Sequence, residues 1–156
     1  MNPEEALIRR AYAAFQADAD AAPPMSLRSG DAVDRYDRPI PYDPKADAPT
    51  DAYLEQYAWG VHHLDPASWR HYLPRLIEYA LLHKEDGPLI IDSTLHSLRP
   101  PDREPPRFAV LTEEQEAVIV AFLDVLAFDE HPLWQEDAMR VLEEYWIPDA
   151  LYRKRR

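Results

Sequence analysis

A proline inside a strongly helical segment is the feature that most constrains how this chain can fold. In residues 64–83, LDPASWRHYLPRLIEYALLH, Asp65 can cap a helix, and Pro66 follows it at the first helical position. Large apolar side chains then recur at three- and four-residue steps, which places them on one face of a helix. Pro74 lies within this pattern and removes one backbone hydrogen bond. We therefore expect the helix to be kinked or split in two.

The length and composition indicate one domain of ordinary size. The chain has 156 residues, of which 46% are hydrophobic, enough to fill a single core. It has no cysteine, which excludes disulfides, thiolate zinc sites and a cysteine nucleophile. Residues 1–10 carry acids, and their apolar residues are periodic rather than continuous, so they do not resemble a signal peptide. We therefore expect a cytoplasmic protein.

The charge is strongly negative and excludes some classes of partner. The net charge is −12 at pH 7, although residues 153–156, RKRR, are all basic. Without these four, 13 of the 17 basic residues face 29 acidic ones, a net charge of −16. Such a surface repels phosphate groups, so we expect neither a nucleic-acid nor a membrane partner. The longest weakly charged run, residues 117–128, is about half the ~20 residues of a membrane-spanning helix.

Helical patterns recur along most of the chain, and no alternating pattern is long enough to indicate a sheet. The expected helices lie at residues 3–19, 51–59, 66–83, 88–98, 112–128 and 132–147. In the fourth of these, residues 89–91 would also suit a strand. We therefore predict a mainly α protein: a single domain over residues 1–152 with five or six helices around a buried helix at 117–128, and a basic tail at 153–156.

Two segments lack a helical pattern. Residues 20–50 contain six prolines and six aspartates, which predicts a long, irregular, acidic loop that is ordered or half-ordered. Residues 99–110 contain two pairs of prolines, which favour an extended polyproline II backbone. This second loop is expected to be a semi-rigid spacer or a ligand for a proline-binding module.

Three segments in the second half of the chain together resemble a known family. They are WRHYLPRLIEYAL at 69–81, LTEEQEAVIVAFLDVL at 111–126 and AMRVLEEYW at 138–146. In this order they resemble a family of small bacterial proteins of unknown function, DUF6714. Its marks are a Tyr-Leu-Pro helix, a Leu-Thr-x-Glu-Gln helix start and a closing aromatic-rich helix. The acidic loop and the basic tail are not part of this pattern. The resemblance implies a bacterial, cytoplasmic, helical protein and carries over no catalytic residue.

The sequence contains none of the common catalytic motifs that we sought. Its three glycines are isolated from one another, so neither a phosphate-binding loop nor a dinucleotide fingerprint can be written. A Gly-x-Ser-x-Gly turn and a His-Glu-x-x-His helix are also absent. We predict no catalytic residue and no cofactor.

One group of residues suggests a metal site. His62, His63 and Asp65 are three possible ligands between two expected helices, to which His71 or Glu78 would add a further ligand. However, adjacent histidines normally point in different directions, and Asp65 already has a capping role. We therefore favour a surface or packing role for these residues, with a metal site as the alternative.

The acidic loop offers the most promising surface for a partner. Tyrosines supply contact area at low entropic cost, and aspartates complement a basic partner. The candidate residues are Asp31, Asp34, Tyr36, Asp37, Tyr42, Asp43 and Asp47. The leading hypothesis is a non-enzymatic, acidic interaction module, such as an immunity-type inhibitor of a basic protein. The alternatives are a small metal-dependent hydrolase or metal-binding protein, and a homo-oligomeric structural protein.

Overall fold

The computed structural model describes residues 2–152, which form helices joined by loops and contain no strand. The α-helices are α1 (Pro3–Ala14), α2 (Gln16–Asp20), α3 (Leu27–Asp34), α4 (Asp51–Gln56), α5 (Pro66–Leu82), α6 (Leu89–Ser97), α7 (Glu113–Ala127) and α8 (Gln135–Val141). Two short 3₁₀ helices, η1 (Ala58–His63) and η2 (Pro132–Trp134), and one π-helical segment, η3 (Leu142–Trp146), complete the set. The prediction of a mainly α fold is confirmed.

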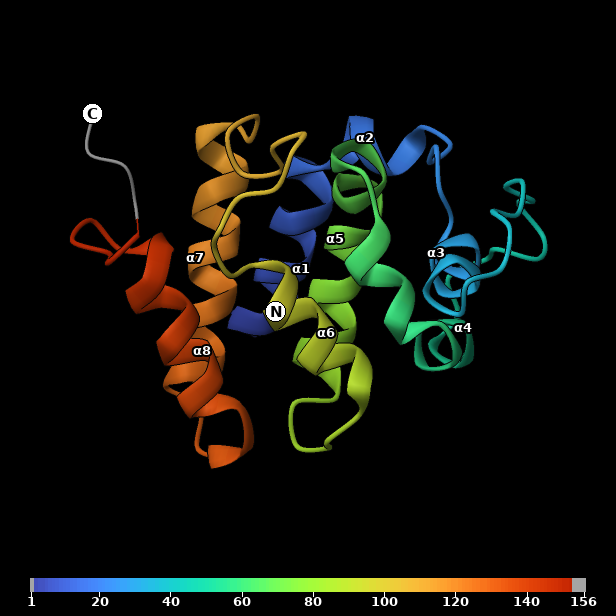
Figure 1. The fold of residues 1–156 in the computed structure, drawn as a ribbon. Coiled ribbons are helices and arrows are strands. Elements are labelled where there is room, and N and C mark those ends of the chain that lie inside the picture. Colours follow the sequence, from blue (N-terminus) through green and yellow to red (C-terminus); the bar gives the residue numbers. More distant parts are fainter. Residues whose placement is uncertain (1, 153–156) are drawn as a thin grey trace.

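The helices surround one continuous core. In Figure 1, α7 and α8 lie along one side of the molecule, α5 and α6 lie near the centre, and α3 and α4 lie at the opposite side. A single cluster of buried apolar residues extends from Leu7 in α1 to Trp146 in η3. Both α5 and α7 contribute long stripes to it. The described residues therefore form one domain.

Helix α5 continues through Pro74 without a break. Its start is capped as expected, because the Asp65 carboxylate accepts a hydrogen bond of 2.9 Å from the Ser68 N–H. Pro74 is buried, and Leu73 and Ile77 beside it are both 0% exposed. Burial of this apolar face offsets the one lost backbone hydrogen bond, so the expected split into two helices does not occur.

The first helix and the segment 20–50 also differ from the sequence prediction. The helix expected over 3–19 ends at Ala14, and α2 begins after Phe15, whose φ of −109° is not helical. Helix α3 lies inside the segment that was expected to be irregular, so residues 20–50 are not a loop throughout. Its start is capped by Ser26, whose hydroxyl accepts a hydrogen bond of 2.9 Å from the Ser29 N–H. The buried face of α3 consists mainly of small residues, which produce no strong apolar pattern.

Helix α3 packs directly on η1 through two glycines. A methyl group added at Gly60 would lie 2.2 Å from the Leu27 carbonyl oxygen, and one added at Gly30 would lie 2.5 Å from the Gly60 carbonyl oxygen. The two backbones therefore touch, which only glycine at both positions allows. The helix expected over 51–59 is shorter, because α4 ends at Gln56, and Gly60 lies within η1.

Other local predictions agree with the structure. Residues 89–97 form α6, so the helical reading is confirmed and the strand alternative is wrong. The helix start expected at 112 is also confirmed, and it is a capping box: Thr112 Oγ1 accepts from the Gln115 N–H, and Gln115 Oε1 accepts from the Thr112 N–H, each at 3.1 Å. The signal for this start is contained within four consecutive residues.

The proline-rich loop is compact rather than extended. Asp102 Oδ1 accepts hydrogen bonds from the backbone N–H groups of Arg103, Arg107 and Phe108 at 3.0, 2.7 and 3.0 Å, and Oδ2 accepts one from Ala109 at 3.1 Å. The loop therefore folds around one carboxylate and does not form the extended polyproline spacer that was expected.

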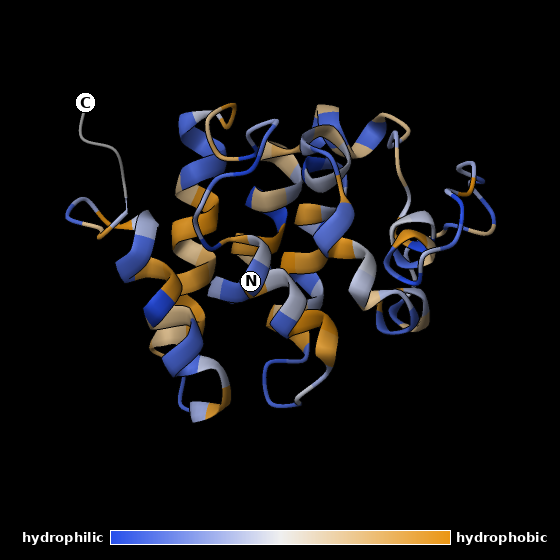
Figure 2. Ribbon diagram, in the orientation of Figure 1, coloured by the Kyte–Doolittle hydropathy of each residue, from blue (hydrophilic) through white to orange (hydrophobic). Residues whose placement is uncertain are grey.

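The distribution of hydropathy agrees with this packing. In Figure 2, hydrophobic residues are concentrated on the helices in the middle of the molecule, and the peripheral loops are mostly hydrophilic. Within residues 2–152, no helix is both long and apolar enough to cross a membrane. The basic tail at 153–156 lies outside the described residues.

Candidate functional site

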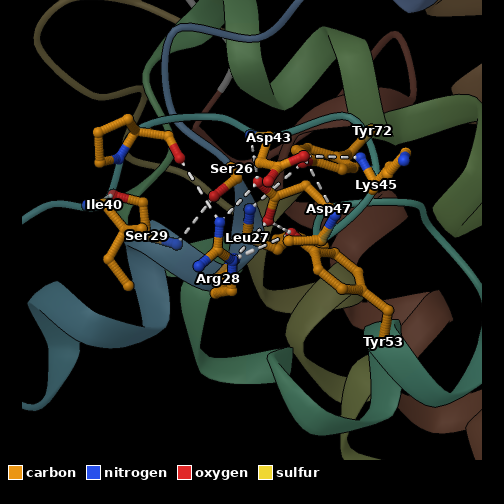
Figure 3. Close-up of polar contacts among 12 residues, drawn as sticks. Ser26, Leu27, Arg28, Ser29, Ile40, Asp43, Lys45, Asp47, Tyr53 and Tyr72 are labelled. Carbon is orange, nitrogen blue, oxygen red and sulfur yellow. Dashed lines mark hydrogen bonds and ion pairs between the residues drawn. The ribbon is translucent and has the colours of Figure 1, made fainter.

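The acidic segment 20–50 is fastened to the helices by a buried carboxylate, Asp47 (Figure 3). Its side chain is 0% exposed. Asp47 Oδ1 accepts hydrogen bonds from Arg28 Nε at 3.0 Å and from the Tyr53 hydroxyl at 2.7 Å. Oδ2 accepts from Arg28 Nη2 at 3.1 Å and from the Asp43 N–H at 2.8 Å. One carboxylate thus connects α3, the following loop and α4.

The same network binds the backbone at the start of α3. The Tyr53 hydroxyl accepts from the Arg28 N–H at 3.1 Å, and the Tyr72 hydroxyl accepts from the Leu27 N–H at 3.4 Å. Burial raises the pKa of Tyr72 to about 12, so this hydroxyl stays protonated at neutral pH. For Asp47, burial opposes ionisation, yet the hydrogen bonds from Arg28 and its neighbours hold its pKa below the ordinary value. These polar groups are satisfied inside the protein.

The structure divides the seven predicted interface residues into buried and exposed groups. Asp34, Tyr36, Asp37 and Asp43 are exposed, Tyr42 is half-buried, and Asp31 and Asp47 are buried. Asp31 forms an ion pair of 3.3 Å with Arg35, while Asp47 is enclosed by the network described above. The expectation that Asp31 and Asp47 present their carboxylates to a partner therefore has to be corrected. Asp47 holds the segment in place, whereas the ion pair of Asp31 lies within the end of α3.

Tyr36 occupies an unusual position directly after α3. Its N–H donates to the Val33 carbonyl at 3.0 Å, and the Asp37 N–H donates to the Ala32 carbonyl at 2.9 Å. This pair of bonds is the Schellman motif, in which the residue at the Tyr36 position is usually glycine. Tyr36 has a φ of +64°, in the left-handed region, and its side chain is 99% exposed. A large aromatic side chain thus projects into solvent from a backbone position that favours glycine.

The predicted metal ligands do not converge. His63 Nε2 lies 2.9 Å from Asp34 Oδ1, and Asp65 caps α5. The His62 ring instead lies against Trp59 and His96, with ring centroids 5.9 and 6.0 Å apart. Among residues 2–152, no group of three or more His, Cys, Asp or Glu side chains is arranged to hold a metal ion. In this structure His63 pairs with Asp34, His62 packs against two aromatic rings and Asp65 caps a helix.

A buried arginine, Arg107, lies near His62 and was not predicted from the sequence. Arg107 is 3% exposed, and its Nη2 donates to the carbonyls of Val61, at 3.2 Å, and Leu64. It satisfies acceptors at the end of η1. Burial, followed by the nearby Arg103, lowers the pKa of Arg107 to about 10. The proline-rich loop supplies this residue, and no local pattern there distinguishes it from a surface arginine.

Comparison with known proteins places the chain in a family. The fold and the site define an acidic protein that is mainly helical over residues 2–152, with a candidate contact segment that carries the fully exposed Tyr36. The chain belongs to a family of unknown function, DUF6714, whose model matches residues 3–150. No curated protein and no solved structure matches it. The match includes the acidic segment 20–50, which the resemblance had left outside the family pattern.

Proposed function

We propose that this protein is a non-enzymatic, acidic interaction module, such as an immunity-type inhibitor, that binds a basic protein through the surface around Tyr36. The supporting observation is the side chain of Tyr36, which is 99% exposed at a position where glycine would avoid a strained backbone. Inside the chain the tyrosine ring buries almost no surface. A contact with another molecule would use it, since tyrosine is enriched among residues that dominate binding energy.

The net charge of the chain, −12, supports a basic partner. Around Tyr36 the exposed charges have both signs: Asp34, Asp37 and Asp43 are acidic, and Arg35, Arg38 and Lys45 are basic. Opposite charge accelerates encounter and disfavours acidic competitors, including nucleic acids and anionic membranes. The absence of cysteine fits action in a reducing compartment, and we place the protein in the bacterial cytoplasm on that basis and on the family resemblance.

The test compares three tagged baits in lysate of the native organism. These are the wild type, Tyr36→Ala and Phe128→Ala, which removes a different aromatic side chain that is 72% exposed. The wild type and Phe128→Ala are expected to retain the same basic protein at low salt and release it at high salt. With the purified partner, Tyr36→Ala is expected to weaken affinity by roughly tenfold or more. Equal binding by all three baits would contradict the proposal.

A second candidate function, a homo-oligomeric structural protein, is favoured by apolar residues at one end of the bundle. Leu82, Leu89, Phe128 and Leu133 are exposed by 65, 39, 72 and 50%. The two turns that carry them are adjacent, because Lys84 Nζ lies 2.7 Å from Asp129 Oδ1. A patch of this kind can associate with a second copy. Sedimentation at rising concentration tests this: a constant monomer mass removes the candidate, and Phe128→Ala should abolish any dimer.

A further inference from the structure

A groove of ≈ 2000 Å³ lies between the proline-rich loop and the carboxy-terminal part of the described chain. Pro100, Pro101 and Pro106 line one wall, while Tyr145 in η3 and the following Leu151 and Tyr152 line the other. In Figure 1 the loop runs beside α7, and the segment after η3 turns away at the outer edge of the molecule. The groove is larger than most small-molecule sites, which are about 300–1,000 Å³.

Hydrogen bonds hold both walls of the groove in place. Arg99 and Glu144 form two hydrogen bonds, of 2.7 and 3.2 Å, that tie the loop to η3. The N–H groups of Leu151 and Tyr152 donate to the carbonyls of Glu143 and Glu144 at 2.9 and 2.8 Å. These contacts indicate that the groove is formed before any ligand arrives, which lowers the entropic cost of binding.

The floor of the groove is aromatic. Phe108, which lines it, is 3% exposed, and its ring centroid lies 5.0 Å from that of Tyr145 and 5.1 Å from that of Trp146. Such packed rings form a rigid apolar surface. Together with the prolines of the opposite wall, they suit the side chains of an extended peptide.

The rim carries more carboxylates than positive charges. Its acidic residues are Asp102, Glu104, Glu113, Glu116, Glu143 and Glu144, and its basic residues are Arg99, Arg103 and Arg140. Two of the arginines have internal partners, because Arg99 pairs with Glu144 and Arg103 donates to the His62 carbonyl. The exposed carboxylates of Glu104, Glu113 and Glu143 thus leave the groove with a negative rim above an apolar floor.

We propose that this groove binds an extended, basic peptide segment of a partner protein. In an extended peptide, side chains alternate between two faces, so basic residues would meet the rim carboxylates while apolar residues rest on Tyr145, which packs against the buried Phe108. The groove lies on the α7–α8 side of the molecule, opposite α3, which precedes Tyr36 (Figure 1). It is therefore a second site, and it rests on the proposed function only for the sign of the partner's charge.

The experiment measures fluorescence anisotropy of a labelled synthetic peptide in which arginine and leucine alternate, at an ionic strength of about 0.15 M. A triple variant, Glu104→Gln, Glu113→Gln and Glu143→Gln, is expected to bind the peptide roughly tenfold more weakly than the wild type. A control variant loses the same charge elsewhere through Asp20→Asn, Asp124→Asn and Glu130→Gln, all at exposed positions. It is expected to change affinity by less than about twofold.

Three further measurements keep the result independent of folding defects and of the Tyr36 surface. Ala109→Arg, at an exposed residue that lines the groove, adds a positive charge without removing a side-chain contact and should weaken binding in the same way. A peptide with serine in place of leucine should also bind more weakly, since it cannot use the apolar floor. Tyr36→Ala should bind the peptide with the affinity of the wild type. A negative result for one site therefore does not contradict the proposal for the other.

Three outcomes would overturn the proposal. Equal weakening by both triple variants would mean that the peptide responds only to net charge. A variant that ends at Tyr152 is compared with the full chain. If only the shortened variant binds the peptide, the ligand of the groove would be the chain's own basic residues 153–156. Self-association that is lost in the groove variant, with no peptide binding in the wild type, would assign the groove to a second copy of this chain.

Discussion

At the scale of single residues, Gly60 controls how closely α3 and η1 approach. An added methyl group would lie 2.2 Å from the Leu27 carbonyl oxygen and 3.0 Å from the Asp31 nitrogen. Both are backbone atoms, so neither can move aside without shifting α3. At Gly87, by contrast, an added methyl group would lie 3.8 Å from Leu133 Cδ2, an ordinary contact distance to a side-chain atom. The two glycines thus form a matched pair for testing this close approach.

Gly60→Ala is expected to lower the free energy of unfolding by roughly 2–3 kcal/mol, because α3 and η1 must separate. Gly87→Ala should leave it unchanged or raise it by up to about 1 kcal/mol, because alanine restricts the unfolded chain. Urea denaturation followed by circular dichroism measures both. Similar stabilities for the two variants would show that the contact between the helices is looser than these distances indicate.

Tyr36 gives a second prediction at this scale, concerning stability rather than binding. Tyr36→Gly is expected to raise the free energy of unfolding by about 0.5–1 kcal/mol, since glycine removes the left-handed strain but adds entropy to the unfolded chain. Tyr36→Ala keeps a β-carbon at the same φ, and should stay within about 0.5 kcal/mol of the wild type. Thermal or urea denaturation distinguishes them. A Tyr36→Gly variant less stable than the wild type would contradict this account.

At the scale of elements, the acidic segment behaves as part of the bundle because of Asp47. This carboxylate links Arg28 in α3, the Asp43 backbone and Tyr53 in α4. Its pKa lies below its ordinary value of 3.8, because hydrogen bonds to the ionised form outweigh the effect of burial. The ionised carboxylate therefore stabilises the fold at neutral pH.

The sign of the pH dependence follows from that pKa. Because the pKa of Asp47 is lower in the folded than in the unfolded state, its contribution to stability is complete above the unfolded value of 3.8. It is lost as the pH falls below that value toward the folded pKa. Asp47→Asn should lower the free energy of unfolding at pH 7 by about 2–3 kcal/mol. The variant should also lose less stability than the wild type on acidification, measured by urea denaturation across this range.

Asp51 provides the control for this prediction. Its pKa is also lowered, chiefly by the hydrogen bond from Arg75, but its side chain is 53% exposed. Solvent screens such a pair, so Asp51→Asn is expected to cost less than about 1 kcal/mol. If the two variants were equally destabilised, the burial of Asp47 would not be the source of its effect.

At the scale of the whole molecule, one core predicts one cooperative unfolding unit. The buried cluster includes Phe15, Leu27, Ile77 and Trp146, which come from segments spread along the described chain. The calorimetric and van't Hoff enthalpies of unfolding are therefore expected to agree. In native-state hydrogen exchange, the amides of Leu27 and Arg28 should open with the same free energy as that of Ile77 in α5. A distinctly lower value for the first two would mean that the acidic segment unfolds separately.

The parts of the fold that could be predicted were those whose signals are local. Asp65, Thr50 and Thr112 each cap a helix by accepting the N–H three residues further on, so a short stretch of sequence contains the complete interaction. The break at Phe15 and the helix α3 were missed, because the first depends on packing and the second has a buried face of small residues. Helical periodicity continues past the break at Phe15 and is weak where α3 forms.

The candidate site was predictable only in part, for the same reason. Asp31 and Asp34 are the same residue type one helical turn apart, yet Asp31 is buried and Asp34 is exposed. Burial depends on whether η1 covers that face of α3, and composition does not contain this information. The ion pair of Arg28 was not predicted either, because its partner Asp47 is 19 residues away and no local pattern connects the two residues.

The sequence by itself determined the helical class, most helix starts, the family and the sign of the net charge, because each depends on neighbouring residues or on composition. The tertiary structure alone decided which carboxylates are buried, that two isolated glycines meet, and that a groove with a negative rim forms beside η3. These features arise where distant segments pack together. Their energies depend on distances between atoms that no pattern along the chain specifies.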